Sequence, residues 1–124
     1  MPTSLRTGVD LIEIDRFTSA YLRHNQHLLQ RLFTPTELFE NGENMPSLAA
    51  RFAAKEAVAK AFGTGIGKIS WHDIEICRGA MGEPILHLHG PAQELAQKLG
   101  LKHWSLSMSH TQKHAIAFVV ALGE

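Results

Sequence analysis

The fold depends on one stretch of sequence, Arg51-Phe52-Ala53-Ala54-Lys55-Glu56-Ala57-Val58-Ala59-Lys60-Ala61-Phe62-Gly63-Thr64-Gly65-Ile66-Gly67. Small apolar residues recur in it at helical spacing and would form one apolar face. Three glycines at alternate positions then end the helical pattern. We therefore expect a long helix from about Ser47 to Phe62, followed by a glycine-rich turn that could bring backbone N–H groups to a phosphate.

Strands are predicted on both sides of this helix. Before it, Gly8–Ile14 alternates in character and is rich in Val and Ile, as strands are. After it come two hairpin patterns, in which the strands are 73–78, 85–89, 104–109 and 114–122. Because the strands come largely as hairpins, we expect an α+β fold whose antiparallel sheet packs against the long central helix.

Three further helices are predicted from their start signals. Asp15 is a candidate N-cap for a helix running to His24 or beyond. The sequence Thr34-Pro35-Thr36-Glu37 has the residues of a capping box, with proline in the first helical position. Gly90-Pro91 opens a helix that runs to about Leu99.

The composition indicates a globular enzyme-sized domain. The chain has 124 residues, 44% of them apolar and 19% charged, so we expect one domain over 1–124. The formal net charge of zero argues against general nucleic-acid binding. No apolar run approaches the ~18 residues of a membrane span, and a single cysteine, Cys77, suits a reducing compartment. We therefore expect a cytoplasmic protein that, being small, completes its site with a neighbouring subunit.

Two acidic positions and one lysine are the first candidates for chemistry. Asp10 alternates onto the same face as Ile12, where a carboxylate needs a metal ion or a basic partner unless it lies at an edge, in water. Glu56 and Lys60 lie four apart on one helix face. They could equally form an ordinary surface ion pair, which stabilises little.

The segment Ser107-Met108-Ser109-His110-Thr111 is the second candidate. Adjacent Ser109 and His110 point to opposite faces of a strand, so a serine hydrolase is not favoured, and His110 with Thr111 suits hydrogen bonding to an anion. The eight histidines also raise a zinc hydrolase as an alternative, but no spacing matches a zinc motif. Arg16, Arg23 and His27 would form a basic stripe that is either solvated or docks an acidic partner protein.

The chain resembles the holo-acyl-carrier-protein synthase family, the short bacterial class of 4′-phosphopantetheinyl transferases. The resemblance covers nearly the whole chain, in the family's order. It is carried by the motifs Gly8-Val9-Asp10-Leu11-Ile12-Glu13-Ile14 with Arg16, Phe33-Thr34-x-x-Glu37, Arg51 to Gly65, Gly82-x-Pro84 and Ser107 to Thr111.

The resemblance implies a fold, a reaction and an assembly. The implied fold is the 4′-phosphopantetheinyl transferase fold. The implied reaction is the transfer of 4′-phosphopantetheine from coenzyme A to a serine of apo acyl carrier protein. This releases adenosine 3′,5′-bisphosphate and supports fatty acid biosynthesis. It also implies a Mg²⁺-dependent homotrimer with active sites between subunits. A coenzyme A-binding module without catalysis is the remaining alternative.

The resemblance also assigns residues. Asp10 and Glu56 match metal-binding carboxylates, Glu56 being also a candidate base, and Lys60 would neutralise the phosphates and assist the leaving group. Arg16, together with Arg23 of the same stripe, would meet the acidic carrier protein. The residues matching the coenzyme A cleft are Arg51, Gly63, Thr64, Gly65, Ile66, Pro84, Ser109, His110 and Thr111. One departure is that Glu40 and Glu43 stand where many relatives carry basic residues, so an extra contact from this segment to the 3′-phosphate is not expected.

Overall fold

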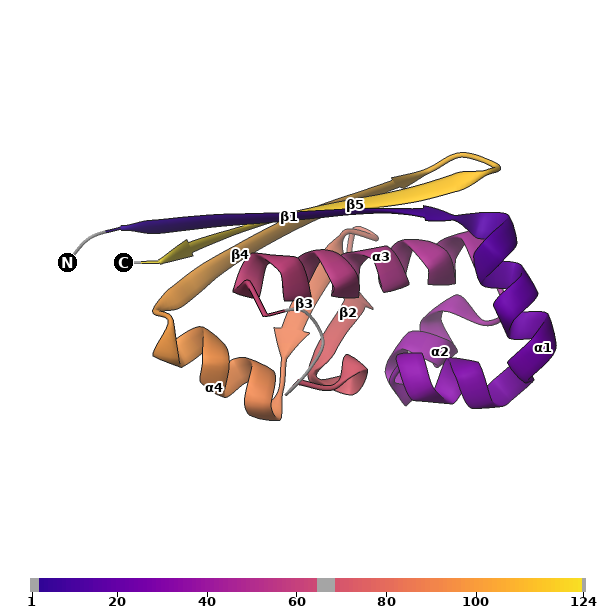
Figure 1. Cartoon of the computed structure of the whole chain (residues 1–124), viewed down its shortest axis with the longest axis horizontal. Helices are drawn as coiled ribbons and strands as arrows, with labels where there is room; N and C mark the ends of the chain where they lie inside the picture. Colours follow the sequence, from indigo (N-terminus) through magenta and orange to yellow (C-terminus); the bar gives the residue numbers. More distant parts are fainter. Residues whose placement is uncertain (1–2, 65–68, 124) are drawn as a thin grey trace.

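The computed structural model of the chain describes residues 3–64 and 69–123. Two antiparallel sheets and several helices are interleaved along it, as the α+β prediction requires (Figure 1). The elements are β1 (Ser4–Glu13), α1 (Ile14–Leu32), α2 (Pro35–Asn41), α3 (Met45–Phe62), a 3₁₀ turn (Trp71–Asp73), β2 (Ile74–Arg78), β3 (Pro84–Leu88), α4 (Gly90–Lys98), β4 (Leu101–His110) and β5 (His114–Gly123).

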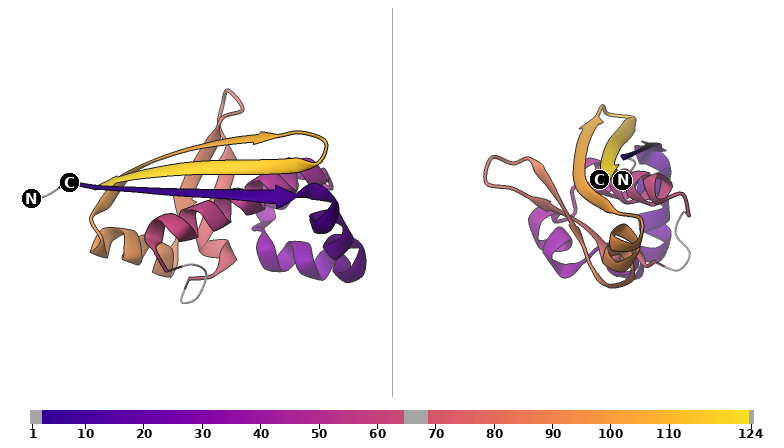
Figure 2. Two further views of the ribbon diagram at one scale, coloured as in Figure 1. Left: turned by 45° about the horizontal axis from the view of Figure 1, so that its top comes forward. Right: turned by 90° about the vertical axis from the view of Figure 1, so that its left-hand side faces the viewer.

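The larger sheet has the order β1-β5-β4, with every neighbouring pair antiparallel, and β2 and β3 form a separate hairpin. Its register aligns Asp10 of β1 with Ala117 of β5, and Ala117 with Met108 of β4. Helix α3 lies lengthwise along one face of this sheet, while α1 and α2 gather at one end of the molecule and α4 at the other (Figures 1 and 2). The predicted packing of an antiparallel sheet on a long central helix is therefore confirmed.

Helix α3 differs from the prediction in how much of it is buried. It begins at Met45, where the Asn44 side chain accepts a hydrogen bond from the Ser47 N–H (3.1 Å), and it ends at Gly63, whose φ of 85° favours glycine. A single apolar face was expected, but most of its circumference is buried, because the sheet, α1 and β2 all contact it. Its alanines permit these elements to approach closely.

Gly8 shows how close this approach is. A Cβ atom added to Gly8 would lie 1.8 Å from the carbonyl oxygen of Ala57, which is a severe clash with backbone. Only glycine therefore lets β1 lie this close to α3. This contact brings the following part of β1, including Asp10, against the last turns of the helix.

Helix α1 corrects two expectations. Asp15 is not its N-cap: β1 pairs with β5 up to Glu13, and the Ile14 N–H donates to the Lys113 carbonyl (2.8 Å), so the N-cap is Glu13 and the helix begins two residues earlier than expected. The helix is also broken at Asn25, where φ is 54° and ψ is −137°. The regular spacing that would have placed His27 on the stripe of Arg16 and Arg23 ends there.

The predicted capping box of α2 is confirmed, and it leads into a buried ion pair. The Glu37 carboxylate accepts from the Thr34 N–H (2.9 Å) and from the Ile76 N–H (2.8 Å), and it pairs with the Lys55 ammonium at 2.7 Å. Lys55 also donates to the Trp71 carbonyl (2.9 Å). Both charged side chains are fully buried, so this network joins α2, α3 and β2 around a saturated set of hydrogen bonds.

The other face of the larger sheet is exposed, and it is apolar along β1 and β5. Alternate residues of β5 are buried against α3, while Ile116 and Phe118 are 40% and 46% exposed on the opposite face. On β1, Val9 and Leu11 are 48% and 62% exposed.

Within the described ranges, no helix has the length and apolarity needed to cross a membrane.

The β2–β3 hairpin is confirmed with small shifts of its ends. Cys77 lies on it, half-buried and unpaired with any other cysteine. Burial and the neighbouring carboxylates raise the pKa of its thiol to about 11, so Cys77 is protonated and unreactive at neutral pH.

Candidate active site

Three of the predicted residues meet at the β1 edge of the larger sheet. The Lys60 ammonium lies 3.1 Å from the Asp10 carboxylate and also donates to the Val9 carbonyl (2.9 Å). Glu56 lies one helical turn before Lys60 on α3, which points it to the same side. We call Asp10, Glu56 and Lys60 the acidic edge, because Lys60 pairs with Asp10 while the charges of both residues act on Glu56.

The electrostatics of the acidic edge suit a bound cation. Partial burial raises the pKa of Glu56, and the negative charge of Asp10 raises it further, while Lys60 lowers it and does not cancel the increase. The two carboxylates therefore repel each other more than Lys60 compensates. A divalent cation would relieve this repulsion, and two carboxylate oxygens are ligands that Mg²⁺ accepts, with water and phosphate oxygens completing its shell.

A zinc centre finds no such support. Among the residues that the structure describes, no three His, Cys, Asp or Glu side chains gather in a way that could hold a metal ion. The ring of His87 on β3 stacks against that of His89, the residue before α4, and His89 pairs with Glu75 at 3.0 Å instead. A two-carboxylate site thus fits only an ion that takes its remaining ligands from elsewhere.

A second group of predicted residues meets at the β4 edge. A pocket of about 280 Å³ lies between the start of α3, the β2–β3 hairpin and the end of β4. We call it the basic edge, because arginines and a histidine line it. Its lining residues are Ser47, Ala50, Arg51, Arg78, Gly82, Pro84, Met108, Ser109 and His110.

The remaining predicted cleft residues have other positions. The Thr111 hydroxyl accepts from the N–H groups of Lys113 and His114 (3.2 Å each), so Thr111 shapes the β4–β5 turn beside His110. Gly63 and Thr64 are exposed at the end of α3. The predictions for Gly65 and Ile66 lie outside the described residues.

The acidic and basic edges do not meet within one chain. The register places Asp10 and Met108 on the two outer strands of the sheet, with β5 between them. Outer strands of a three-stranded sheet are about 10 Å apart, since neighbouring strands lie about 4.8 Å apart. No residue of the acidic edge lines the basic pocket.

The predicted docking residues share a surface on α1. Arg16 and Arg23 are both exposed and line one hollow of about 380 Å³ with Asp15, Ser19 and Leu22. Leu22 is 68% exposed there. The surface thus combines two cationic groups with an apolar side chain, which is how interfaces for acidic amphipathic helices are built.

Sequence reasoning missed three residues that organise these edges. Arg6 donates to the Phe62 carbonyl (2.9 Å) and caps the C-terminus of α3 from β1. Lys55 was quoted only as part of a motif, although it forms the buried pair with Glu37. Arg78 was not singled out, yet it lines the basic pocket. Only Lys55 had a visible signal, a charge inside an alanine-rich helix.

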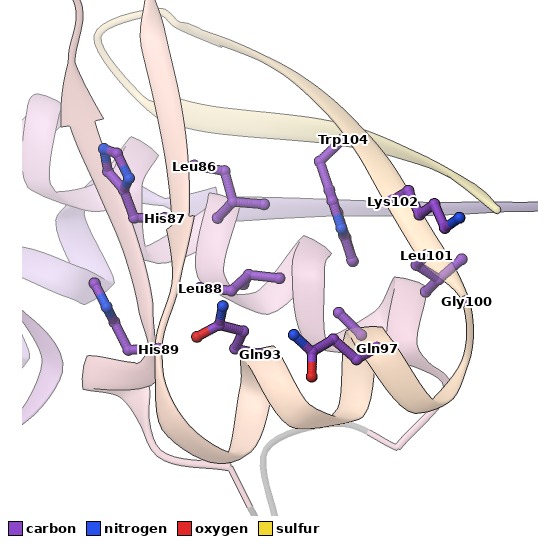
Figure 3. Close-up of a pocket in the computed structure, with 11 residues that line it drawn as sticks. Leu86, His87, Leu88, His89, Gln93, Gln97, Gly100, Leu101, Lys102 and Trp104 are labelled. Atoms are coloured by element: carbon purple, nitrogen blue, oxygen red, sulfur yellow. The ribbon is translucent and has the colours of Figure 1, made fainter. Parts of the chain in front are cut away.

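A hollow larger than both of these pockets lies elsewhere. It has about 650 Å³ and opens between β3, α4 and the start of β4, where Leu86, Leu88 and Trp104 face it with Gln93 and Gln97 (Figure 3). No residue predicted for catalysis or binding lines it. Size alone therefore does not identify the site in this chain.

Comparisons with known proteins identify the family of the chain. The sequence model described as the 4′-phosphopantetheinyl transferase superfamily matches residues 6–119. A protein from Herpetosiphon aurantiacus named holo-[acyl-carrier-protein] synthase is 48% identical to this chain, over 96% of this chain and 99% of that protein.

Solved structures show the same fold. The holo-[acyl-carrier-protein] synthase of Neisseria meningitidis is 40% identical, with a TM-score of 0.85 over 94% of this chain and 96% of that one. The enzyme of the same name from Helicobacter pylori, solved in complex with coenzyme A, is 33% identical, with a TM-score of 0.85 over 93% and 98% of the two chains. The chain therefore belongs to the 4′-phosphopantetheinyl transferase superfamily and is a transferase.

Proposed function

We propose that this chain transfers 4′-phosphopantetheine from coenzyme A to a serine hydroxyl of an apo acyl carrier protein, releasing adenosine 3′,5′-bisphosphate and thereby supporting fatty acid biosynthesis. The observation that carries the proposal is the acidic edge. There a carboxylate with a raised pKa, a second carboxylate and a lysine converge in a member of this transferase superfamily. The name of the H. pylori relative and its bound coenzyme A support the same substrate.

The acidic edge supplies the chemistry. Asp10 and Glu56 would hold Mg²⁺, which when bound neutralises charge on the pyrophosphate. Glu56 accepts the proton of the carrier's serine, and the serine oxygen forms a bond to the phosphorus that bears pantetheine. The bond from that phosphorus to the bridging oxygen breaks, and its electron pair leaves with adenosine 3′,5′-bisphosphate. Lys60 neutralises the charge that develops on this leaving group.

The basic edge would hold the nucleotide end of coenzyme A. Arg51 and His110 present cationic or hydrogen-bonding groups, and Pro84 and Ser109 complete the wall of the same pocket. The glycine turn after α3, with Gly63 and Thr64 at its start, would line the adjoining part of the cleft.

A homotrimer would join the two edges. The exposed apolar face of the sheet, which includes Val9, Leu11, Ile116 and Phe118, is a surface that a second copy of the chain would cover. In a closed ring of three, the acidic edge of one subunit would adjoin the basic edge of the next. This arrangement accounts for why one chain separates residues that the reaction needs together.

The carrier protein would dock on α1. Arg16 and Arg23 attract an acidic partner, and Leu22 between them offers apolar contact area. Docking there delivers the partner to the end of β1, from which α1 continues directly. The unreactive Cys77 is compatible with the proposed cytoplasmic location.

Intact-mass measurement of a carrier protein tests the proposal. An apo acyl carrier protein is incubated with coenzyme A, Mg²⁺ and the protein, and the carrier should gain the mass of one phosphopantetheine. A chelator, or Glu56→Gln, should abolish the gain, whereas Arg31→Ala, which changes an exposed arginine outside both edges, should not. Coenzyme A binding without any mass gain would overturn the transferase assignment in favour of a binding module.

A further inference from the structure

Arg78 enters the basic pocket from the end of β2, and the structure fixes its side chain there. Its Nη1 donates to the Glu40 carbonyl (3.2 Å) and its Nη2 to the Asn41 side-chain oxygen (3.4 Å). The Arg78 N–H also donates to the Glu40 carboxylate (2.9 Å). The C-terminal part of α2 thus holds Arg78 in place by three hydrogen bonds.

Arg51 faces the same pocket and is almost completely buried. It is 6% exposed, and its Nη1 donates to the Ser47 hydroxyl (3.1 Å). Ser47 in turn donates to the Asn41 oxygen that also accepts from Arg78, so one chain of hydrogen bonds links the two arginines. The Arg51 Nε is a buried donor that lacks a hydrogen-bond partner among the described residues.

The charges around this pocket are unbalanced. Burial lowers the pKa of Arg51, and the positive charge of Arg78 lowers it further. The carboxylates of Glu40 and Glu37 raise this pKa without cancelling the decrease, and Glu37 is itself paired with Lys55, so Glu40 is the nearby carboxylate that faces two guanidinium groups. A buried guanidinium with an unused N–H, beside a second guanidinium, is a site for a doubly charged oxyanion.

We propose that Arg78, together with Arg51, binds a phosphomonoester dianion in this pocket and so determines specificity. This inference rests on the proposed function, under which the dianion is the 3′-phosphate of coenzyme A. The segment before α3 carries the acidic residues Glu40 and Glu43, and Arg78 then supplies the positive charge that this segment does not. The protein discriminates coenzyme A from dephospho-coenzyme A through this residue.

A substrate comparison tests the role of Arg78. In Arg78→Ala, kcat/KM for transfer from coenzyme A should fall about tenfold to hundredfold, the loss of charge-assisted hydrogen bonds. The value for dephospho-coenzyme A should not change. Arg78→Lys keeps the charge without the planar guanidinium group. Its kcat/KM for coenzyme A should therefore lie between the values of the parent and of Arg78→Ala. Arg31→Ala is the matched control and should resemble the parent with both substrates.

Calorimetry separates this inference from the proposed function. The parent should bind adenosine 3′,5′-bisphosphate more tightly than adenosine 5′-monophosphate, and Arg78→Ala and Arg78→Lys, both checked by thermal melting, should lose much of that difference. The same result without any transfer activity would defeat the proposed function and leave the phosphate site standing. The role of Arg78 would be overturned if kcat/KM fell equally for coenzyme A and dephospho-coenzyme A. It would also be overturned if the folded variants kept the parent's preference for adenosine 3′,5′-bisphosphate over adenosine 5′-monophosphate.

Discussion

The two edges of the larger sheet carry opposite charges on one scaffold. At the β1 edge, Lys60 pairs with Asp10, and the pKa of the nearby Glu56 is raised because burial and Asp10 disfavour its charge. At the β4 edge, Arg51 and Arg78 line the same pocket. The pKa of Arg51 is lowered because burial and the positive charge of Arg78 disfavour its charged form. Each edge has one more charge of its own sign than its counter-charge offsets, so the first suits a cation and the second an oxyanion.

The difference shows how a small chain prepares a site without completing it. A third charged group, the pair of Lys55 on α3 and Glu37 on α2, is fully buried and fully hydrogen-bonded. Saturated charges hold the helix in position, and unsaturated charges remain available for ligands. A structural charge in this chain therefore has all its hydrogen bonds and its counter-charge, whereas a functional charge lacks some that a ligand can supply.

Breaking the central pair should have the largest effect, because both edges depend on the position of α3. Lys55→Ala leaves the Glu37 carboxylate buried without its cation, and we expect a loss of about 3–5 kcal/mol of unfolding free energy. Chemical denaturation measures it. The double variant Lys55→Met/Glu37→Leu should recover part of that loss, since no charge is left unpaired although the Thr34 and Ile76 N–H groups lose their acceptor. A double variant as unstable as Lys55→Ala would contradict a role based on paired charge.

Changing the acidic edge should lower kcat. Glu56→Gln keeps the shape of the side chain and removes the base, so we expect kcat for phosphopantetheine transfer to fall about 10²- to 10⁴-fold. Initial rates with saturating coenzyme A measure this. A change in KM alone would place Glu56 outside the chemical step.

Changing the basic edge should instead raise KM. His110→Ala removes one exposed side chain that lines the nucleotide pocket, and we expect KM for coenzyme A to rise about tenfold with little change in kcat. The same initial-rate experiment with varied coenzyme A measures it. A pure kcat effect would mean that the two edges do not divide binding and chemistry as proposed.

The smallest effect concerns stability and pH in the metal-free protein. The pKa of Glu56 is raised in the folded state, so its ionisation costs stability as pH rises from the ordinary glutamate pKa through the raised value. In thermal melting with a chelator, the stability of Glu56→Gln relative to the parent should therefore increase as the pH rises across that range. Mg²⁺ at ten times its Kd should then stabilise the parent alone by about 1.4 kcal/mol. Equal stabilisation of both proteins would place the cation elsewhere.

Much of the fold could be predicted because its signals are local. The capping box of Thr34 and Glu37, the β2–β3 hairpin and the glycine that ends α3 each depend on a few neighbouring residues. The N-terminus of α1 was misplaced because pairing of β1 with β5, a long-range contact, overrode the cap signal at Asp15. The break at Asn25 has no local signal of the glycine or proline kind.

The site was harder to predict because its residues converge only in three dimensions. The spacing of Glu56 and Lys60 alone indicated an ordinary ion pair, and the contact of Gly8 with Ala57 is what brings Asp10 to them. Arg78 lies 27 positions after Arg51, on another element, and nothing in the sequence links them. Family resemblance located the motifs, but only the structure showed that one chain keeps the two edges apart.

Mixing two inactive variants tests the joining of edges between subunits most directly. Glu56→Gln lacks a working acidic edge, and Arg78→Ala/His110→Ala lacks a working basic edge. Each should be nearly inactive at coenzyme A well below KM. Co-expressed one to one, they should recover roughly a quarter of parent activity, since random mixing pairs two intact edges at that fraction of interfaces in a ring. No recovery, with mixed oligomers confirmed by native mass spectrometry, would contradict a site shared between subunits.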